Sequence, residues 1–416
     1  MARGRALGEP LAHPDVRRLW AAQLTSELGD WAARLALGVL IYQRTHSASL
    51  VGLVTAASMV GWFGPGQLLV SVTERFSRRS VMVAADLVRL TAFAIALVPL
   101  PAPVLVVLVV LAGCATPPFE AARSALRPQL IPPQLLGAAI AVTQLTGDAS
   151  IFAGYLVGGA LVAAVGPSAA LAANAVSFAL SALLSARLPR RERPRELPPR
   201  RLRTAAGLLS REPVLRRAVV LVLVTQAGAV GAEALVVPYA DRVLGAGGGW
   251  AAVLAAVGAI ACLASTAGLP LTGDVAALLR RCAVLSMVAG GATVAAFLLL
   301  PAWAGVLPFA AAGCLAVVMV PANVVVGPAL PDAIRASAFG LLAGSTVAAQ
   351  AAGAAVAGLL ASAISVPAAA ALVAAPALVA GLLAVLRPVF PEPGDAAAAP
   401  GPGGPVRELS APELPA

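Results

Sequence analysis

The 416-residue sequence contains no lysine, so all 29 of its basic residues are arginine. Charged residues of both signs make up only 12% of the chain, whereas a soluble domain typically contains about 25%. Hydrophobic residues make up 60%, and the mean hydropathy is +0.90. A chain with so few charges cannot cover a globular surface with polar side chains. The composition therefore excludes an ordinary soluble protein and predicts one whose outer surface faces lipid.

Histidine and cysteine are also scarce. His13 and His46 both fall outside the long apolar runs, which disfavours histidine proton relays and metal chemistry. The sequence has neither a GxxxxGK[ST] phosphate-binding loop nor an HExxH zinc motif. The cysteines lie in or beside apolar runs without CxxC spacing: Cys114, Cys262, Cys282 and Cys314. We therefore expect no metal ion, no cofactor and no ATP-driven step within this chain.

Long apolar runs fill most of the sequence. A bilayer core about 30 Å thick is crossed by roughly 20 apolar residues in a helix, and such runs recur about twelve times. They begin near Leu19, Ser49, Ser80, Pro103, Gly137, Ser168, Arg217, Gly249, Arg281, Val306, Phe339 and Val366. The sequence therefore predicts an all-α integral membrane protein with about twelve transmembrane helices.

The clearest boundary lies between the sixth and seventh runs. Residues 189–216 are basic and rich in proline, which predicts a cytoplasmic linker that faces lipid headgroups and separates two six-helix bundles, 19–188 and 217–387. Residues 1–18 are too polar for the apolar core of a signal peptide and are predicted as a cytoplasmic N-terminal segment. Residues 388–416 are rich in Pro, Gly and Ala and are predicted as a disordered cytoplasmic tail.

Arginines gather on alternate connections between the apolar runs. The connections after the second, fourth, eighth and tenth runs carry Arg75, Arg78, Arg79, Arg127, Arg280, Arg281 and Arg335. Connections on the other side carry only Arg44 and Arg242. Because arginine is retained on the cytoplasmic side, we predict a multi-pass protein of a bacterial plasma membrane with both termini cytoplasmic. The same distribution explains the net charge of +10 without a nucleic-acid partner.

The two halves share weak identities at a steady offset of about 200 residues. The pair Gly113-Cys114 matches Gly313-Cys314, and the arginine pair at 78–79 matches the pair at 280–281. A steady offset is typical of parallel repeats related by an axis along the membrane normal. We therefore predict that the two bundles are pseudo-symmetric.

Charged residues inside the predicted spans are candidates for function, because a charge at mid-bilayer costs roughly 2.5–3.5 kcal/mol even on a lenient insertion scale. In the first span, Gln23, Glu27, Asp30 and Arg34 follow one another at intervals of four, three and four, which places them on one helix face. We expect this face to line a central cavity. Two interpretations of Asp30 and Arg34 stay open, a silent structural pair or part of a gate. Glu27 has no equally placed partner, so taking up a proton would relieve its charge.

Two more spans offer candidates. Gln144 and Asp148 lie one helical turn apart in the fifth span. Glu233 lies in the seventh span, where it either faces the cavity or sits near the outer end in contact with water. The full set of proton-coupling or cavity candidates is Glu27, Asp30, Arg34, Gln144, Asp148 and Glu233.

Four segments in the first half match a known family. They are Leu28-Gly29-Asp30-Trp31, TERFSRRSVMVAADLVR after the second span, PPFEAARSALRPQLIPPQLLGAA at the end of the fourth, and GYLVGGALVAAVGPSAAL in the fifth. They resemble the major facilitator superfamily and, within it, the macrolide-efflux and enterobactin-exporter-like branch. The resemblance covers residues 15–190 and is thin beyond them. It implies the major facilitator fold and a secondary active transporter.

The resemblance also implies roles for two motifs. The family's Gly-x-x-x-Asp-Arg-x-Gly-Arg-Arg loop latches the two halves on the cytoplasmic side, and here both glycines are absent and the acid is Glu74. We interpret Glu74, Arg75, Arg78 and Arg79 of this loop as a cytoplasmic latch. Four residues of the third and fourth spans near this loop are interpreted as part of the latch, with substrate ligands as the alternative: Asp86, Arg89, Glu120 and Arg123. The family's antiporter motif has a proline where this chain has Tyr155, which weakens the case for proton antiport. Its small residues predict close helix packing: Gly154, Gly158 and Gly159.

From these observations we predict a monomer that exports a small molecule by alternating access in exchange for protons. A cavity lined mostly by Ala, Val, Leu and Gly with few acids would suit a lipophilic substrate. The expected partners are this substrate, protons and the lipid bilayer. The alternatives are a metabolite importer or facilitator, and a non-transporting helper of membrane assembly or secretion. An enzyme is disfavoured because the sequence offers no His/Asp/Ser constellation at one membrane face.

Overall fold

Helices make up nearly all of the described chain in the computed structural model. The structure describes residues 9–73, 76–189, 200–267, 275–326, 330 and 332–387, and within them it contains no strand. The predicted tail 388–416 and residues 190–199 of the predicted linker lie outside the described residues.

Seven α-helices and two short 3-10 helices, η1 (Glu9–Ala12) and η2 (Arg127–Gln129), form the first half. The α-helices are α2 (Pro14–Thr45), α3 (Ala48–Phe63), α4 (Pro65–Thr73), α5 (Arg78–Ala96), α6 (Ala102–Leu126), α7 (Pro133–Ala164) and α8 (Pro167–Ala186). Local sequence sets their ends. The Ser47 and Ser77 side chains cap α3 and α5 by accepting backbone N–H groups. Pro65 separates α3 from α4, because proline lacks the N–H that would continue the helix.

The second half repeats this arrangement after α9 (Arg200–Arg211). Its elements are α10 (Pro213–Ala234), α11 (Val236–Arg242), α12 (Gly248–Ala267), α13 (Val275–Leu299), η3 (Ala302–Ala304), α14 (Val306–Cys314), η4 (Leu315–Val318), α15 (Met319–Val326), α16 (Asp332–Ala363) and α17 (Val366–Leu386). Taking α3 with α4, α10 with α11, and α14 through α15 as single spans gives twelve spans, each of which begins within seven residues of its predicted position.

Charge separates the spans of the described chain into two groups. Nine helices are long and apolar enough to cross a membrane. The helices α2 and α5 are not among them, because every 18-residue stretch of either helix carries at least three charged residues. The remaining span is interrupted by η4. The charge of the membrane core is therefore concentrated in two helices of the first half.

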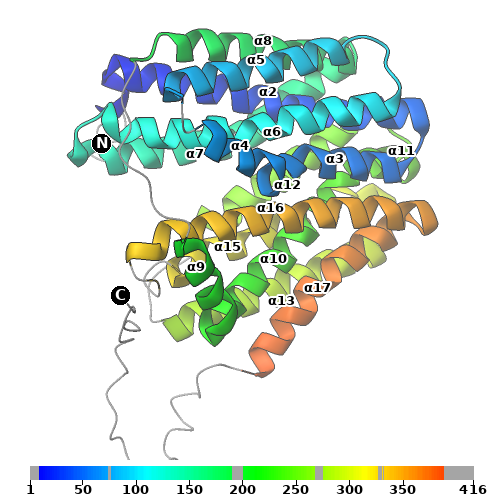
Figure 1. The fold of residues 1–416 in the computed structure, drawn as a ribbon. Helices are drawn as coiled ribbons and strands as arrows, with labels where there is room; N and C mark the ends of the chain where they lie inside the picture. The colour runs from blue at the N-terminus through cyan, green and yellow to red at the C-terminus, as the bar shows by residue number, and fades with distance from the viewer. Residues whose placement is uncertain are drawn as a thin grey trace, which may run out of the picture.

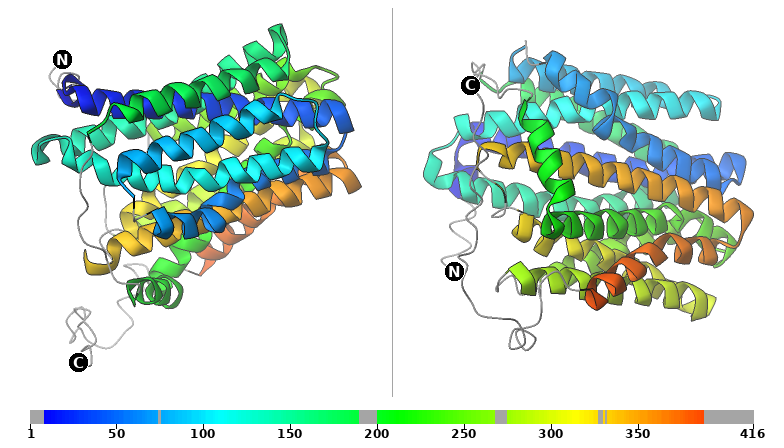
Figure 2. Two further views of the ribbon diagram at one scale, coloured as in Figure 1. Left: turned by 45° about the horizontal axis from the view of Figure 1, so that its top comes forward. Right: turned by 60° about the horizontal axis from the view of Figure 1, so that its bottom comes forward.

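The two halves pack in the same way. In the first, α2 contacts α7 and α8, and α6 contacts α3; in the second, α10 contacts α16 and α17, and α14 contacts α12. The halves meet where α3 packs on α16 and α12 packs on α7. These two contacts are equivalent, because α12 occupies the position of α3 in the second half and α16 that of α7. Figure 1 shows the halves as an upper and a lower layer, and Figure 2 shows α16 along the seam in two further views. This confirms the predicted pair of pseudo-symmetric six-helix bundles.

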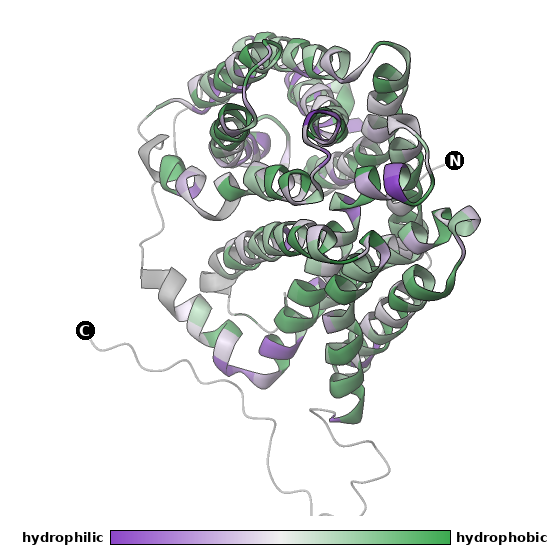
Figure 3. Ribbon diagram, turned by 90° about the vertical axis from the view of Figure 1, so that its right-hand side faces the viewer, coloured by the Kyte–Doolittle hydropathy of each residue, from purple (hydrophilic) through white to green (hydrophobic). Residues whose placement is uncertain are grey.

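The helices run between two ends of the molecule (Figure 1). We call the end of the molecule where Arg78 and Arg79 begin α5 and where α9 lies the arginine-rich end, at the left of Figure 1. The other end, which holds α11, is the opposite end. Hydrophobic residues dominate the helices when they are viewed from that end (Figure 3). Side chains such as Val176 and Leu183 of α8 are more than 60% exposed, as expected for a surface in contact with lipid.

A glycine from each half allows equivalent helices to touch. A Cβ on Gly113 of α6 would lie 2.6 Å from the backbone oxygen of Ser58 in α3, and one on Gly313 of α14 would lie 2.0 Å from that of Gly258 in α12. The repeated Gly-Cys pair of the sequence thus occupies the same helix contact in both halves. Neither contact leaves room for a side chain.

We expect Gly313→Ala to destabilise the protein by roughly 1–3 kcal/mol, because the new methyl group forces α12 and α14 apart. Its control is Gly344→Ala in α16, where a Cβ would meet nothing within 4 Å. That variant should be neutral or stabilising by up to about 1 kcal/mol, because alanine favours a helix over glycine. Melting temperatures of the purified proteins in detergent test both, and equal values for the two variants would contradict the close contact.

Candidate functional site

A cavity of about 470 Å³ lies between the two halves, within the ≈300–1,000 Å³ typical of ligand pockets. Helices α2, α3, α5, α6 and α7 of the first half and α16 of the second line it. Its charged lining residues are Glu27, Asp30, Arg34, Arg89 and Glu120. Its aromatic lining residues are Trp31, Phe93 and Phe119. The lining is therefore more charged and more aromatic than the one expected from the sequence.

The halves close around this cavity at the opposite end. A Cβ on Gly52 of α3 would lie 2.8 Å from the Cα atom of Gly358 in α16. One on Gly159 of α7 would lie 2.1 Å from the Cβ atom of Ala252 in α12. The cavity lies on the arginine-rich side of these contacts, and the Asp30 side chain within it is 41% exposed. We infer that the cavity is sealed at the opposite end and opens toward the arginine-rich end.

The polar face of α2 lines the cavity over three helical turns. Gln23, Glu27, Asp30 and Arg34 all belong to the lining, as their spacing along the helix predicts. Gln23 donates a hydrogen bond of 2.8 Å to Glu27 Oε1. The close approach of α2 to α8 is possible because Gly29 faces Ser177, where a Cβ would lie 2.2 Å from the Ser177 oxygen.

Arg89 joins α5 to the floor of the cavity. It pairs with Asp86 on its own helix and lies 3.8 Å from Asp30 Oδ2 on α2. Its guanidinium also lies 4.5 Å and 4.6 Å from the ring centres of Phe119 and Phe178. Asp86 is fully buried and accepts a further 2.7 Å bond from the Ser181 hydroxyl. A buried charge needs such partners, so this group fixes α5 against α2, α6 and α8.

Arg34 joins the two halves. Its Nε atom lies 3.3 Å from Glu233 Oε1 on α10, and the Tyr155 hydroxyl of α7 donates to the same carboxylate oxygen. The Trp31 ring packs edge-on against the Tyr155 ring, with 5.4 Å between the ring centroids. Arg34 Cζ lies 5.0 Å from the centroid of the Trp31 ring. Asp30 and Arg34 therefore pair with residues on other helices and not with one another. Glu233 is the second-to-last residue of α10, and its carboxylate contacts Arg34 and Tyr155 of the first half.

The remaining acids of the cavity differ in their partners. Glu120 pairs with Arg123 on α6. Among the described side chains, Glu27 lies within ion-pair distance of no arginine, and its Oε2 atom is buried without a hydrogen-bond partner. The surface of α7 facing that oxygen is Gly147, where a Cβ would lie 3.4 Å away. Glu27 is thus the acid of the cavity whose charge is least compensated.

The residues interpreted as a cytoplasmic latch divide into three groups. Glu74 and Arg75 lie outside the described residues. Arg78 donates to the backbone oxygen of Ala125, and Arg79 to that of Leu188 at 3.3 Å. The two pairs described above, Asp86 with Arg89 and Glu120 with Arg123, lie within the first half. These hydrogen bonds and ion pairs join residues of the first half.

The candidates on α7 are spread along the helix. Gln144 lines the cavity, and the side chain of Asp148 lies outside the described residues. Gly154 and Gly158 face α2, where a Cβ would lie 2.5 Å from Trp31 Cβ and 2.6 Å from Ala32 Cα, respectively. Gly159 faces α12 across the seam, so the three glycines place α7 against both halves.

Two further groups of residues contribute to the cavity and to its closure. Gln350 of α16 lines the cavity and donates a 2.9 Å bond to Gln226 of α10. Tyr42, Asp241 and Arg242 form a polar cluster between the halves at the opposite end. The one signal for this cluster was Arg242 itself, a basic residue on the side of the membrane where arginine is rare.

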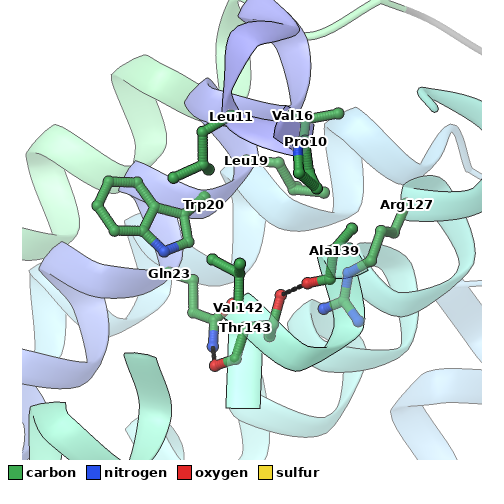
Figure 4. A pocket seen from close by; sticks show the side chains of 10 residues that line it. All are labelled: Pro10, Leu11, Val16, Leu19, Trp20, Gln23, Arg127, Ala139, Val142 and Thr143. Atoms are coloured by element: carbon green, nitrogen blue, oxygen red, sulfur yellow. Dashed lines mark hydrogen bonds between the residues drawn. The ribbon is translucent and has the colours of Figure 1, made fainter. Parts of the chain in front are cut away.

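A second hollow, shown in Figure 4, lies between η1, α2 and α7 near the arginine-rich end. Its volume is about 10 Å³, at the lower limit for one water molecule. Across it Gln23 donates to the backbone oxygen of Thr143 at 3.4 Å. It is therefore a packing defect beside the cavity, too small for a substrate. Among the described residues, no group of three or more His, Cys, Asp or Glu side chains is placed to hold a metal ion.

Comparisons with known proteins agree with this geometry. The family model described as Major Facilitator Superfamily matches residues 19–319. A bacterial homolog of the human lysosomal transporter Spinster, in an inward-facing and unoccupied conformation, is similar with a TM-score of 0.66 and 16% identity over 90% of this chain and 94% of that chain. The nucleoside transporter NupG is similar with a TM-score of 0.69 and 14% identity over 90% and 99%.

A third solved structure, the POT family transporter PepTSo, has a TM-score of 0.68 and 13% identity over 90% of this chain and 97% of its own. At these identities the likeness shows the fold alone. A comparison with curated protein sequences finds no significant match.

Proposed function

Because the chain belongs to the Major Facilitator Superfamily, we propose that it exports a small lipophilic molecule in exchange for protons. The direction is taken from the resemblance of residues 15–190 to the macrolide-efflux and enterobactin-exporter-like branch. One chain contains both halves and the cavity between them, so a monomer suffices for alternating access.

The distribution of arginine supports a cytoplasmic location for the arginine-rich end and for both termini, in a bacterial plasma membrane. With that orientation, the cavity is accessible from the cytoplasm and the contacts at the opposite end seal it from the outside. An exporter takes up its substrate in this conformation.

The proposal of proton coupling rests on Glu27. It is an acid in a membrane-embedded cavity without an ion-pair partner among the described side chains, and one of its oxygens is buried without a hydrogen bond. A carboxylate without a nearby cation is unfavourable inside the membrane. Protonation of Glu27 removes this free-energy cost, which is several kcal/mol at most. Asp30 is a second candidate, because it shares Arg89 with Asp86.

The lining supports a lipophilic substrate that is neutral or positively charged. Trp31, Phe93 and Met59 offer apolar surface, and three of the five charged lining residues are acids. A cation would take the place of the proton on Glu27, and a neutral molecule would bind the apolar surface while the proton leaves. In both cases substrate and proton compete for the same cavity, and competition of this kind couples their movements.

The test is accumulation in inverted membrane vesicles from an efflux-deficient host, using macrolides, siderophores and lipophilic cationic dyes with and without a protonophore. We expect accumulation of at least one compound, abolished by the protonophore. Accumulation that is insensitive to the protonophore would reject proton coupling, and accumulation only in right-side-out vesicles would indicate an importer. Unchanged proton-driven transport in both Asp30→Asn and Asp148→Asn would remove these two acids from the mechanism.

A further inference from the structure

Arg44 and Arg242 are the basic residues that the charge bias of the sequence leaves unexplained, because both lie at the opposite end, where arginine is rare. Arg44 donates to the backbone oxygen of Leu100 at 3.1 Å, within the first half. Arg242 makes a different set of contacts, which crosses the boundary between the halves.

Arg242 is the last residue of α11, and each nitrogen of its guanidinium donates a hydrogen bond. Nε donates to the Tyr42 hydroxyl at 2.9 Å, Nη2 to the backbone oxygen of His46 at 2.7 Å, and Nη1 to that of Ala361 at 3.3 Å. Tyr42 and His46 belong to the first half, and Ala361 to the second. The Tyr42 hydroxyl in turn donates to Asp241 Oδ2 at 3.1 Å. One arginine therefore connects both halves through three hydrogen bonds, and Asp241 joins the cluster through Tyr42.

The backbone at this place suits a cation. Ala361 lies in the last turn of α16, and His46 follows the last residue of α2, so Arg242 lies at the C-terminal ends of two helices. The last carbonyl groups of a helix have no hydrogen-bond partner within that helix, and they lie at the negative end of the helix dipole. His46 adopts a left-handed conformation with φ 48°, and its N–H closes α2 by donating to Tyr42 at 2.7 Å.

Beneath this cluster the halves form a dry seal. Val39 of α2 is 2% exposed, and a Cβ on Gly248 of α12 would lie 3.2 Å from its methyl group and from that of Val162. A Cβ on Gly358 of α16 would lie 2.7 Å from the backbone oxygen of Ala48. These contacts leave no space for solvent, and apolar contacts have no directional preference that fixes one closed position.

We propose that Arg242, with Tyr42 and Asp241, is a clasp that fixes the closed position of the opposite end, and that the clasp must open before the cavity can open there. The proposal concerns positioning and holds for either direction of transport and for any coupling ion. It also accounts for an arginine on the arginine-poor side of the membrane.

The experiment measures how fast a cysteine placed beneath the clasp reacts with a charged maleimide. Val39→Cys is introduced into the full chain, which is purified and reconstituted in lipid nanodiscs, so that reagent reaches both ends. We expect slow labelling of this introduced cysteine, and a rate roughly tenfold higher when Arg242→Gln is added, the factor that one hydrogen bond to a charged group represents. The chain without Val39→Cys gives the background of the native cysteines.

Arg44→Gln is the matched control, because it removes an arginine of the same end that bonds within one half. It should leave the labelling of the introduced cysteine unchanged. Native Cys282, fully buried in the second half, reports general loosening of the fold. The proposal would be overturned if the introduced cysteine were labelled at the same rate with and without Arg242→Gln. It would also be overturned if Arg242→Gln raised the labelling rates of both the introduced cysteine and Cys282. If Arg242→Gln does not fold, Tyr42→Phe replaces it, since it removes the shared hydroxyl and keeps the ring.

Discussion

Replacing Glu27 with glutamine is expected to reduce proton-driven accumulation in inverted vesicles by roughly 5- to 150-fold, the range of typical coupling free energies between two ligands. Glutamine has nearly the same shape and can still accept the hydrogen bond from Gln23, but it cannot carry a proton. Binding of a neutral substrate to the purified protein should change little. The variant should therefore separate binding from coupling.

A direct measurement is proton release on substrate binding in weakly buffered detergent solution. The unaltered protein should release protons when it binds a compound that passes the vesicle test, and Glu27→Gln should release fewer. Asp15→Asn is the control, because Asp15 is an acid of the same helix that pairs with Arg18 in an exposed position outside the cavity. If Glu27→Gln releases as many protons as Asp15→Asn does, Glu27 is not the carrier.

The second large effect is expected on stability. Arg89→Leu should destabilise the protein by about 3–5 kcal/mol, because it leaves the carboxylate of Asp86 buried without its cation. Asp86 is fully buried and Arg89 is 2% exposed, so water cannot replace the lost partner. Arg89 also fills the space between Phe119 and Phe178, and leucine covers less of either ring. The melting temperature of the purified protein in detergent measures the loss.

The exposed pair of Arg18 and Asp15 provides the comparison. Their side chains are 42% and 37% exposed, and Arg18→Gln should change stability by less than about 1 kcal/mol. Arg89→Lys keeps the charge but not the planar contact with the two rings, so its melting temperature should fall between those of Arg89→Leu and the unaltered protein. A melting temperature for Arg89→Leu as high as that of Arg18→Gln would show that Asp86 is not held as an ion.

The positions of the spans and the polar face of α2 follow from local properties of the chain. Apolar runs of about 20 residues place the helices, because backbone groups in lipid must bond within their own segment. The intervals between Gln23, Glu27, Asp30 and Arg34 match the helical period, so these side chains share one face whatever surrounds the helix. The same reasoning identified Glu233 as an interior candidate but left its partner open.

Partner choice depends on helices that are distant in the sequence. The spacing of Asp30 and Arg34 permits a pair on one helix, but α5 brings Arg89 to Asp30 and α10 brings Glu233 to Arg34. The family resemblance predicts a latch between the halves on the cytoplasmic side. The structure instead brings the halves into close contact at the opposite end. No local pattern contains the distance between helices that are far apart in the chain.

The sequence by itself thus determined that this is a twelve-span helical membrane protein and which face of α2 is polar, because hydropathy and helical period act within a single segment. Only the tertiary structure decided which of the described cavity acids lacks an ion-pair partner and which arginine hydrogen-bonds to both halves at the opposite end. Glu27 and Arg242 acquire these roles through helix packing, since an ion pair or a hydrogen bond forms only where two helices bring its atoms within about 4 Å or less.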